Sequence, residues 1–207
     1  MSRFNNLRRL SLAGLVALVH CSNDAAGPDE VCAGYADWTT SAYVLPYATG
    51  QTFTVIQGNC SPPGDGHRGG NRYGYDFDLP IGTQFSAARA GVVAEVEESH
   101  VDAQVAATGL DNYIVIRHAD GSVALYGHLT HNGALVAIGD SVAQRQPIGL
   151  SGNTGNTANI PHLHFSLQSC DPVVGGSDGC PTIPSTFRNT AANPNGLQLG
   201  HSYTALP

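Results

Sequence analysis

The segment NYIVIRHADGSVALYGHL, residues 112–129, constrains the fold more than any other part of the chain. Side chains alternate along an extended strand, so Ile114 and Ile116 point to one side while Val115 and Arg117 point to the other. The turn-forming residues ADGS follow, and the apolar run VALYGHL then leads the chain back. This pattern predicts an antiparallel β-hairpin.

Glycine and proline divide the rest of the chain into short apolar runs. The 25 glycines and 12 prolines leave no segment with a long amphipathic period of 3.6 residues, so long helices are not expected. The runs AYVLPY and QTFTVIQGNC within residues 33–60, then YDFDLP and GTQFSAARAGVVAEVEE, favour strands. We therefore predict a mainly β fold, in which a single domain is built on antiparallel β-sheet with short strands, long loops and few helices.

The first 21 residues have the pattern of an export signal. Basic residues precede an apolar run, Leu10 to Val19, that is too short to span a bilayer comfortably. The run ends in LVHC, which resembles the lipobox of bacterial lipoproteins, with Cys21 as the acylated residue and His20 where that pattern has a small residue. A plain signal peptide cut a little downstream is the alternative. We expect a protein exported from a bacterial cell, either periplasmic, anchored to the outer membrane or secreted, whose contact with a membrane is through a lipid on Cys21.

Residues 22–32 are expected to form a polar tether, and residues 33–207 the folded domain. The chain contains no lysine, so its nine basic residues are arginines. Three of these lie in the export signal, which leaves six arginines against sixteen carboxylates. A protein that binds nucleic acid without regard to sequence needs a basic surface, so this composition argues against a nucleic-acid partner.

Five cysteines in an exported chain leave one without a partner. If Cys21 carries a lipid, the other four form two disulfides. Cys170 and Cys180 bracket a short loop rich in glycine, aspartate and proline and are the natural local pair, so Cys32 and Cys60 pair by elimination. A zinc site built on cysteine is the competing interpretation, but the chain has no Cys-x-x-Cys spacing to support it.

Two histidines in the run PHLHF point toward the same face of an expected strand. His162 and His164 are separated by one residue, and side by side they disfavour each other's protonation, so a neutral pair suited to a metal is natural. A strand face with two solvated histidines is the alternative, and this run alone does not decide between them. His100, His118 and His131 fall at turns or strand ends, where we expect solvated imidazoles.

Further candidate ligands come from separate parts of the chain. His67 lies in the loop GDGHRGG, Asp76 opens the strand-like run YDF, and His128 lies in LYGHL. Zinc in hydrolytic sites commonly takes three histidine or carboxylate ligands and keeps one position for water. Together with PHLHF, these residues supply enough ligands and leave histidines for proton transfer.

Four motifs in this order resemble the lysostaphin/LytM-type zinc metallopeptidases, which cut peptide cross-links in bacterial cell walls. They are a histidine followed by YDF and P-x-GT, then AARAGVV, then HADGSVALYGHL, and finally GNTGN with PHLHF, within about residues 66–168. The resemblance implies one Zn²⁺ per chain, bound by His67, Asp76 and His164. It also implies that His128 and His162 are the catalytic pair that does not bind the metal.

The implied activity is hydrolysis of peptide cross-links in peptidoglycan, by attack of a zinc-bound water assisted by the two histidines. The loop RGGNRYGY between the first two ligands is longer than in the shortest family members. That length leaves Asp65 and Asp78 as alternative carboxylate ligands, although the YDF context favours Asp76. The glycines of SGNTGN, with Gly69 and Gly70, are expected either to edge a substrate groove or to serve as ordinary turn residues.

The expected partner is therefore a peptidoglycan peptide, and a monomer is expected. One alternative is a non-catalytic lipoprotein of the same fold that binds the wall or regulates other hydrolases. Another is a zinc peptidase that acts on proteins. The presence of all five family residues favours an enzyme.

Overall fold

A computed structural model describes residues 32–60, 67, 69–103, 109–170 and 180–207. The expected export signal, Cys21 and nearly all of the expected tether lie outside the described residues. Contacts divide the chain into two units, Met1–Val31 and Cys32–Pro207, and the fold below is that of the second. In the described part of the chain, no helix combines the length and the apolar character needed to cross a membrane.

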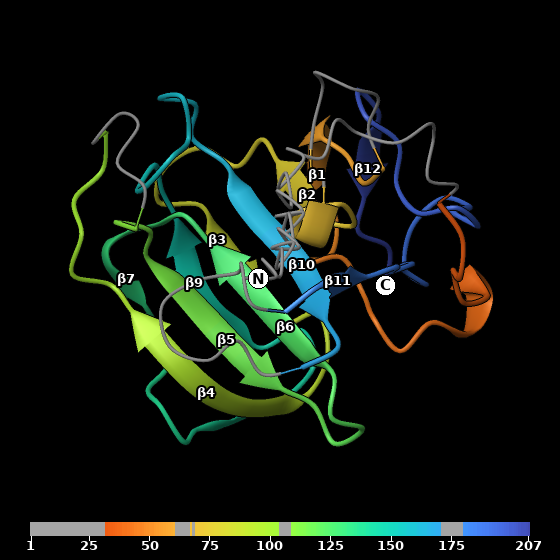
Figure 1. Ribbon diagram of the computed structural model, residues 1–207, viewed down its shortest axis with the longest axis horizontal. Helices are drawn as coiled ribbons and strands as arrows, with labels where there is room; N and C mark the ends of the chain where they lie inside the picture. The colour runs from red at the N-terminus through yellow and green to blue at the C-terminus, as the bar shows by residue number, and fades with distance from the viewer. Residues whose placement is uncertain (1–31, 61–66, 68, 104–108, 171–179) are drawn as a thin grey trace, which may run out of the picture. The chain divides into compact units, whose positions relative to one another are not determined.

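Antiparallel pairing joins most strands into one nine-stranded sheet, ordered β12-β1-β2-β10-β6-β5-β4-β8, with β11 paired to β10 (Figure 1). A smaller sheet has the order β3-β9-β7. Among the described residues the only helices are two short 3₁₀ turns, η1 and η2, so the predicted mainly β, antiparallel fold class is confirmed. In chain order the elements are η1 (Trp38–Thr40), β1 (Thr52–Gln57), η2 (Gly69–Asn71), β2 (Tyr75–Phe77), β3 (Gln84–Ser86), β4 (Gly91–Glu97), β5 (Tyr113–Arg117), β6 (Val123–Gly127), β7 (Leu129–Ala134), β8 (Ser141–Val142), β9 (Pro147–Ser151), β10 (Leu163–Gln168), β11 (Thr182–Ile183) and β12 (Ser202–Thr204).

The predicted hairpin is formed by β5 and β6. Its register runs from Tyr113 opposite Gly127 to Arg117 opposite Val123. The ADGS turn closes it, with Gly121 in the left-handed region at φ 84°. This hairpin is the centre of the large sheet and ends one residue before a candidate catalytic histidine.

The hydrophobic core lies against the face of the large sheet to which Ile114, Ile116 and Phe165 point, and it includes Phe85 and Ile148 of the small sheet. Strand β10 alternates accordingly: Leu163, Phe165 and Leu167 belong to this core, and the residues between them point to the other face. The strand that holds the candidate site is thus anchored by its alternate side chains.

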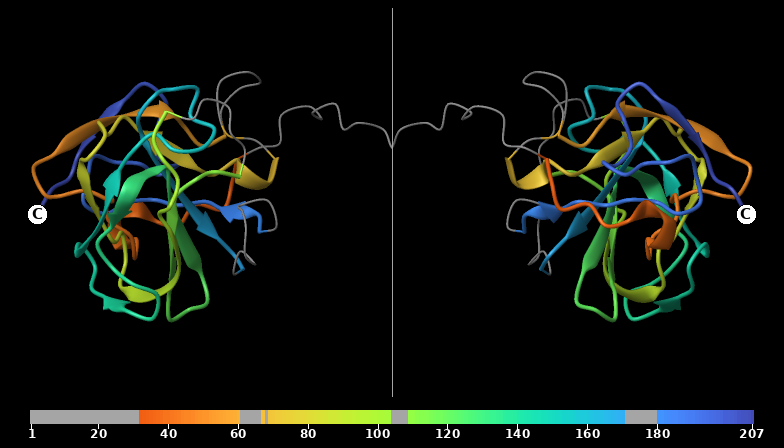
Figure 2. Two further views of the ribbon diagram at one scale, coloured as in Figure 1. Left: turned by 90° about the vertical axis from the view of Figure 1, so that its left-hand side faces the viewer. Right: turned by 90° about the vertical axis from the view of Figure 1, so that its right-hand side faces the viewer.

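The last strand of the described chain packs against the first one. Strand β12 pairs with β1, and Figure 2 shows the C-terminal segment (blue) beside this early strand (orange). The predicted strand in AYVLPY is wrong, because residues 42–47 form an irregular extended segment. Two of its backbone hydrogen bonds join it to residues 86–88, from Val44 N to Ala88 O and from Ser86 N to Pro46 O. The pairing does not continue as a ladder, because Leu45 N donates to the Asn189 side chain and Ala88 N to the Tyr126 hydroxyl.

Both predicted disulfides are present, Cys32–Cys60 and Cys170–Cys180. The expectation that His118 is solvated is wrong, since only 3% of it is exposed. Its Nδ1 lies 2.9 Å from Ala90 O, its ring packs edge-on against Tyr43, and its Nε2 is buried with no hydrogen-bond partner. The side chain lies at the hairpin turn, and segments distant in sequence cover it.

Gly149 of β9 has no room for a side chain. A Cβ there would lie 2.5 Å from Phe85 Cζ and 3.2 Å from Ile114 Cδ1. We expect Gly149→Ala to lower the free energy of unfolding by about 1–3 kcal/mol, the usual cost of overpacking a core. Urea denaturation measures this, with Gly70→Ala as the control because its added methyl group meets nothing within 4 Å. Equal stability of the two variants would contradict the packing described here.

His118 should make stability depend on pH. Burial lowers its pKa, and the positive charge of Arg89 adds to this effect. The unfolded chain therefore binds a proton at His118 at a higher pH than the folded chain does, so the free energy of unfolding falls as pH drops below about 6.5. In His118→Asn, whose amide can replace the Nδ1 donor, part of this loss should disappear. Thermal unfolding between pH 7 and pH 5 tests the prediction, and the exposed His131→Asn should keep the wild-type slope.

Candidate metal centre and its histidine pair

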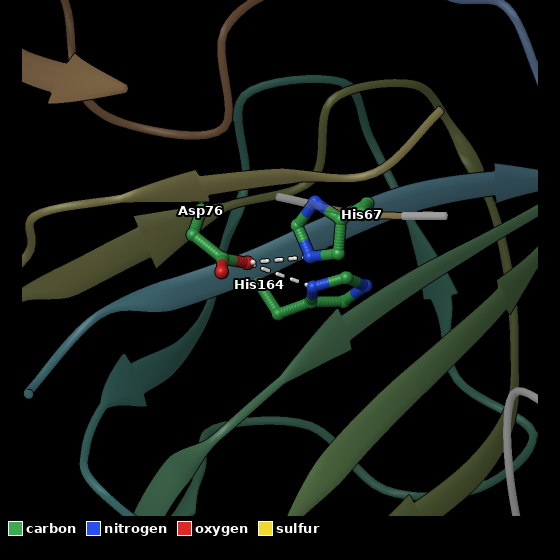
Figure 3. Close-up of side chains that lie close together, drawn as sticks. All are labelled: His67, Asp76 and His164. Atoms are coloured by element: carbon green, nitrogen blue, oxygen red, sulfur yellow. Dashed lines mark hydrogen bonds and ion pairs between the residues drawn. The ribbon is translucent and has the colours of Figure 1, made fainter. Parts of the chain in front are cut away.

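Strand pairing brings two of the predicted ligands together. Asp76 is the middle residue of β2 and His164 the second residue of β10, and the antiparallel register places them directly opposite each other. His67 joins them from the loop before η2, as Figure 3 shows. His164 Nδ1 lies 2.8 Å and His67 Nε2 3.3 Å from the same carboxylate atom, Asp76 Oδ1. One donor atom from each residue lies within 4.8 Å of the others.

Two glycines leave space for the His164 side chain. A Cβ on Gly74, just before β2, would stand 2.9 Å from His164 Cε1. A Cβ on Gly127, at the end of β6, would stand 3.3 Å from His164 Cβ. The imidazole therefore lies between two residues that carry no side chain, and a side chain at either position would crowd His164.

The charges of the three residues are coupled. Burial would raise the pKa of Asp76, but hydrogen bonds from His164 and His67 hold it well below its usual value. Burial lowers the pKa of His164 to about 4, so this imidazole is neutral at pH 7. For His67, burial opposes protonation, and the hydrogen bond to Asp76 outweighs it and raises the pKa.

The donor set fits a metal ion. Two imidazole nitrogens and a carboxylate oxygen are ordinary zinc ligands, and donor atoms on one tetrahedral zinc ion lie about 3.4 Å apart. The spacings here begin at 2.8 Å and reach at most 4.8 Å, so small side-chain movements would bring them to bonding geometry. The side chains of Asp76 and His164 are almost completely buried, and a bare carboxylate there would be costly without cationic partners.

The two alternative carboxylate ligands are not part of this cluster. Asp78 is exposed, and its Oδ1 accepts a hydrogen bond of 2.6 Å from Thr54 N. This contact gives Asp78 a structural role, because it holds the residue that follows β2 against β1. Asp65 lies outside the described residues.

The two remaining predicted residues lie beside the three candidate ligands. The His128 ring centroid is 4.5 Å from that of His162 and 5.9 Å from that of His164. In each ring Nδ1 faces a backbone carbonyl, Thr154 O at 2.8 Å from His128 and Ile160 O at 2.7 Å from His162. His162 Nε2 lies 3.5 Å from Asp76 Oδ2. The structure thus brings together all five residues that the sequence singled out.

One residue near the site was missed from the sequence. Asp111 Oδ1 lies 3.2 Å from His128 Nδ1. Burial would lower the pKa of His128, but the hydrogen bond with Asp111 and nearby carboxylates raises it. For His162, burial dominates and lowers the pKa. Asp111 belongs to no motif. The feature that could have pointed to it is the hairpin register, which places Asp111 next to the residue that faces His128.

Comparison with known proteins identifies the family. The model of peptidase family M23 matches residues 70–175, about half of the chain. This chain belongs to peptidase family M23. The matched span contains Asp76, His128, His162 and His164, while His67 lies three residues before it.

Curated relatives align over the same part of the chain. Peptidoglycan DD-endopeptidase ShyA of Vibrio cholerae is 40% identical over 94 residues, which are 45% of this chain and 19% of the relative. Lysostaphin of Staphylococcus simulans is 38% identical over 101 residues, 48% of this chain and 18% of the relative. Glycyl-glycine endopeptidase ALE-1 of Staphylococcus capitis is 37% identical over 105 residues, which are 50% of this chain and 26% of the relative. The chain spans about a fifth to a quarter of the length of these relatives.

Solved structures give similar matches. A point mutant of the catalytic domain of the prophage-encoded M23 protein EnpA from Enterococcus faecalis aligns with a TM-score of 0.49 at 26% identity. The alignment covers 68% of this chain and 94% of that domain. The catalytic domain of lysostaphin from Staphylococcus simulans aligns with a TM-score of 0.45 at 30% identity, over 64% of this chain and 87% of that domain.

Proposed function

We propose that this chain is a zinc-dependent endopeptidase that hydrolyses peptide cross-links of bacterial peptidoglycan. The observation that carries the proposal is the cluster of His67, Asp76 and His164 with two further histidines in contact with it. A protein that only binds the wall needs neither convergent ligands nor adjacent imidazoles. The complete set therefore favours catalysis over the alternative of a non-catalytic wall-binding or regulatory lipoprotein.

His67, Asp76 and His164 would hold the ion. Two neutral imidazoles and one carboxylate leave a bound zinc ion with one net positive charge. Zinc in such a site polarises a carbonyl group and lowers the pKa of bound water towards neutrality. The protein contributes the position of the ligands, because β2 and β10 fix two of the three by their register.

His128 and His162 would transfer protons. A neutral imidazole whose proton is held on Nδ1 by a carbonyl has its lone pair on Nε2. Both rings have this arrangement, so each presents a nitrogen that can accept a proton from the attacking water. In protonated form, the same nitrogen can donate to the developing oxyanion or to the leaving amine.

The family and its relatives support this substrate class. ShyA is named as a peptidoglycan DD-endopeptidase and ALE-1 as a glycyl-glycine endopeptidase, so both kinds of peptide cross-link are candidates here. Both substrates lie outside the cytoplasm, and the two disulfides agree with an oxidising compartment. These observations support the proposal that the exported protein acts at the bacterial cell wall, with Cys21 as its candidate lipid anchor.

The activity is tested on two purified types of peptidoglycan, one with direct D-alanine cross-links and one with glycine bridges. We expect soluble muropeptides whose masses identify the cleaved bond, and loss of their release on chelation. Release that continues undiminished after chelation would reject the zinc mechanism. Cleavage of a denatured protein substrate instead of both wall types would favour the peptidase that acts on proteins.

Single substitutions separate ligands from proton-transfer residues. His128→Ala and His162→Ala should lower the rate by about 10²–10⁴-fold, the usual contribution of general acid–base catalysis, and should retain zinc. His164→Ala should lose stoichiometric zinc, measured by mass spectrometry of the metal. His131→Ala, an exposed histidine outside the cluster, is the matched control and should keep both zinc and activity. Loss of zinc in His128→Ala would mean that the roles are assigned wrongly.

Gly74 gives a test of ligand position that changes no ligand. Its replacement by alanine places a methyl group 2.9 Å from His164 Cε1, so the ring must move. We expect the zinc affinity of Gly74→Ala to fall by about 10- to 100-fold, as when the partners of metal ligands are changed. Competition with a chromophoric chelator measures it. Gly70→Ala, with open space at its Cβ, should match wild type, and an unchanged affinity in Gly74→Ala would refute the role of His164 as a ligand.

A further inference from the structure

The two catalytic histidines differ in what holds them. Nδ1 of His162 faces one backbone carbonyl, Ile160 O. Nδ1 of His128 faces both Thr154 O at 2.8 Å and the carboxylate Oδ1 of Asp111 at 3.2 Å. Asp111 is separate from the metal centre, where Asp76 is the carboxylate shared by the candidate ligands.

The surrounding backbone accommodates this carboxylate closely. Gly155 has φ 76°, and a Cβ there would lie 1.8 Å from Asp111 Oδ1. A residue with a side chain at this position would displace the carboxylate. The next residue, Asn112, is completely buried, and its backbone N donates to Thr154 Oγ1 at 3.0 Å. Its side-chain amide also reaches carbonyls of β7, so the segment beside Asp111 is fixed on both sides.

His128 itself has an unusual backbone. It lies between β6 and β7 with φ 64°, a left-handed conformation that costs a residue with a side chain about 1 kcal/mol or more. This conformation makes the chain change direction at the point where the ring meets His162. Such strain persists where surrounding contacts enforce it, and the contacts to Thr154 and Asp111 are two of these.

We propose that Asp111 is a positioning residue for His128. Together with Thr154 O, its carboxylate keeps the proton of the neutral ring on Nδ1, which leaves Nε2 as the basic nitrogen. A ring with its lone pair on Nδ1 would face two acceptor oxygens at once, and one of them carries a full negative charge. A 180° flip of the ring would leave both oxygens facing a carbon atom. The second acceptor thus strengthens the preference that Thr154 O already gives to this tautomer and this ring orientation.

The structural part of this inference stands without an assay of activity. Long-range ¹H–¹⁵N spectra of the full chain labelled at histidine distinguish the two imidazole tautomers, and His128→Gln identifies the His128 signals by their loss. At a pH above the raised pKa of His128, where the ring is neutral, we expect the Nδ1-protonated form in wild type, both without metal and with zinc. In Asp111→Ala, where Thr154 O still accepts from Nδ1, we expect a measurable share of the Nε2-protonated tautomer beside the wild-type form, and Asp111→Asn, whose amide oxygen can still accept, should reduce that share.

The catalytic consequence rests on the proposed function. Asp111→Ala should lower kcat by about 10- to 100-fold, less than the about 10²–10⁴-fold contribution of general acid–base catalysis, because His128 itself remains. KM and zinc content should stay unchanged, and Asp111→Asn should recover part of the loss. Asp120→Ala, at the opposite end of the same hairpin, is the matched control and should keep wild-type kcat and tautomers. Gly155→Ala should reproduce the effect of Asp111→Ala, because its methyl group occupies the position of the carboxylate.

The possible failures are distinguishable. If Asp111→Ala keeps the wild-type tautomer and the wild-type kcat while wild type cleaves peptidoglycan, the positioning role is wrong and the proposed function stands. If wild type cleaves no peptidoglycan but the tautomer changes in Asp111→Ala, the contact is real and the proposed function is wrong. Loss of zinc in Asp111→Ala would also overturn the positioning role, because it would place Asp111 in the support of the metal centre.

Discussion

The antiparallel pairing of β2 with β10 is the interaction on which the rest of the site depends. It places Asp76 opposite His164, and the same strand β10 packs Leu163, Phe165 and Leu167 into the core. A register slip of one residue would exchange the two faces of β10 and bury the histidines where the core should be. The strand register that packs the core is therefore the same register that assembles the site. Assembly of the candidate ligands is thus coupled to the stability of the domain.

Local features of the sequence were enough to predict the hairpin, whereas the ligand cluster was predicted with the resemblance to a family as well. The β5–β6 hairpin carries its own alternation and turn residues, and PHLHF carries two histidines at strand spacing beside apolar residues. His67, His128 and Asp76 lie far from PHLHF in sequence, and the resemblance to a family assigned them to one site. Geometry then separated Asp76 from Asp78, which strand spacing alone did not do.

The failures arise where distant segments decide the environment. AYVLPY has strand-forming residues and makes two backbone hydrogen bonds with residues 86–88, but Leu45 N and Ala88 N donate to distant side chains instead, so no ladder forms. His118 follows a strand like an ordinary turn residue, and Tyr43, from a segment far away in the chain, covers it. Asp111 was missed because it approaches His128 through the hairpin register and the space at Gly155. Each of these depends on chain packing that composition and spacing do not encode.

The disulfides and the candidate metal site are built from different types of side chain. Cys32, Cys60, Cys170 and Cys180 are consumed in cross-links, whereas the three candidate ligands are imidazole and carboxylate groups. Thiolate ligands are lost when oxidants convert them to disulfides or sulfenic acids, but imidazole and carboxylate groups do not undergo that chemistry. The conditions that close the cross-links therefore leave the ligand set intact. An oxidising environment can therefore stabilise the fold through its disulfides and still preserve the side chains that would bind a metal. No reductant is needed to protect these side chains.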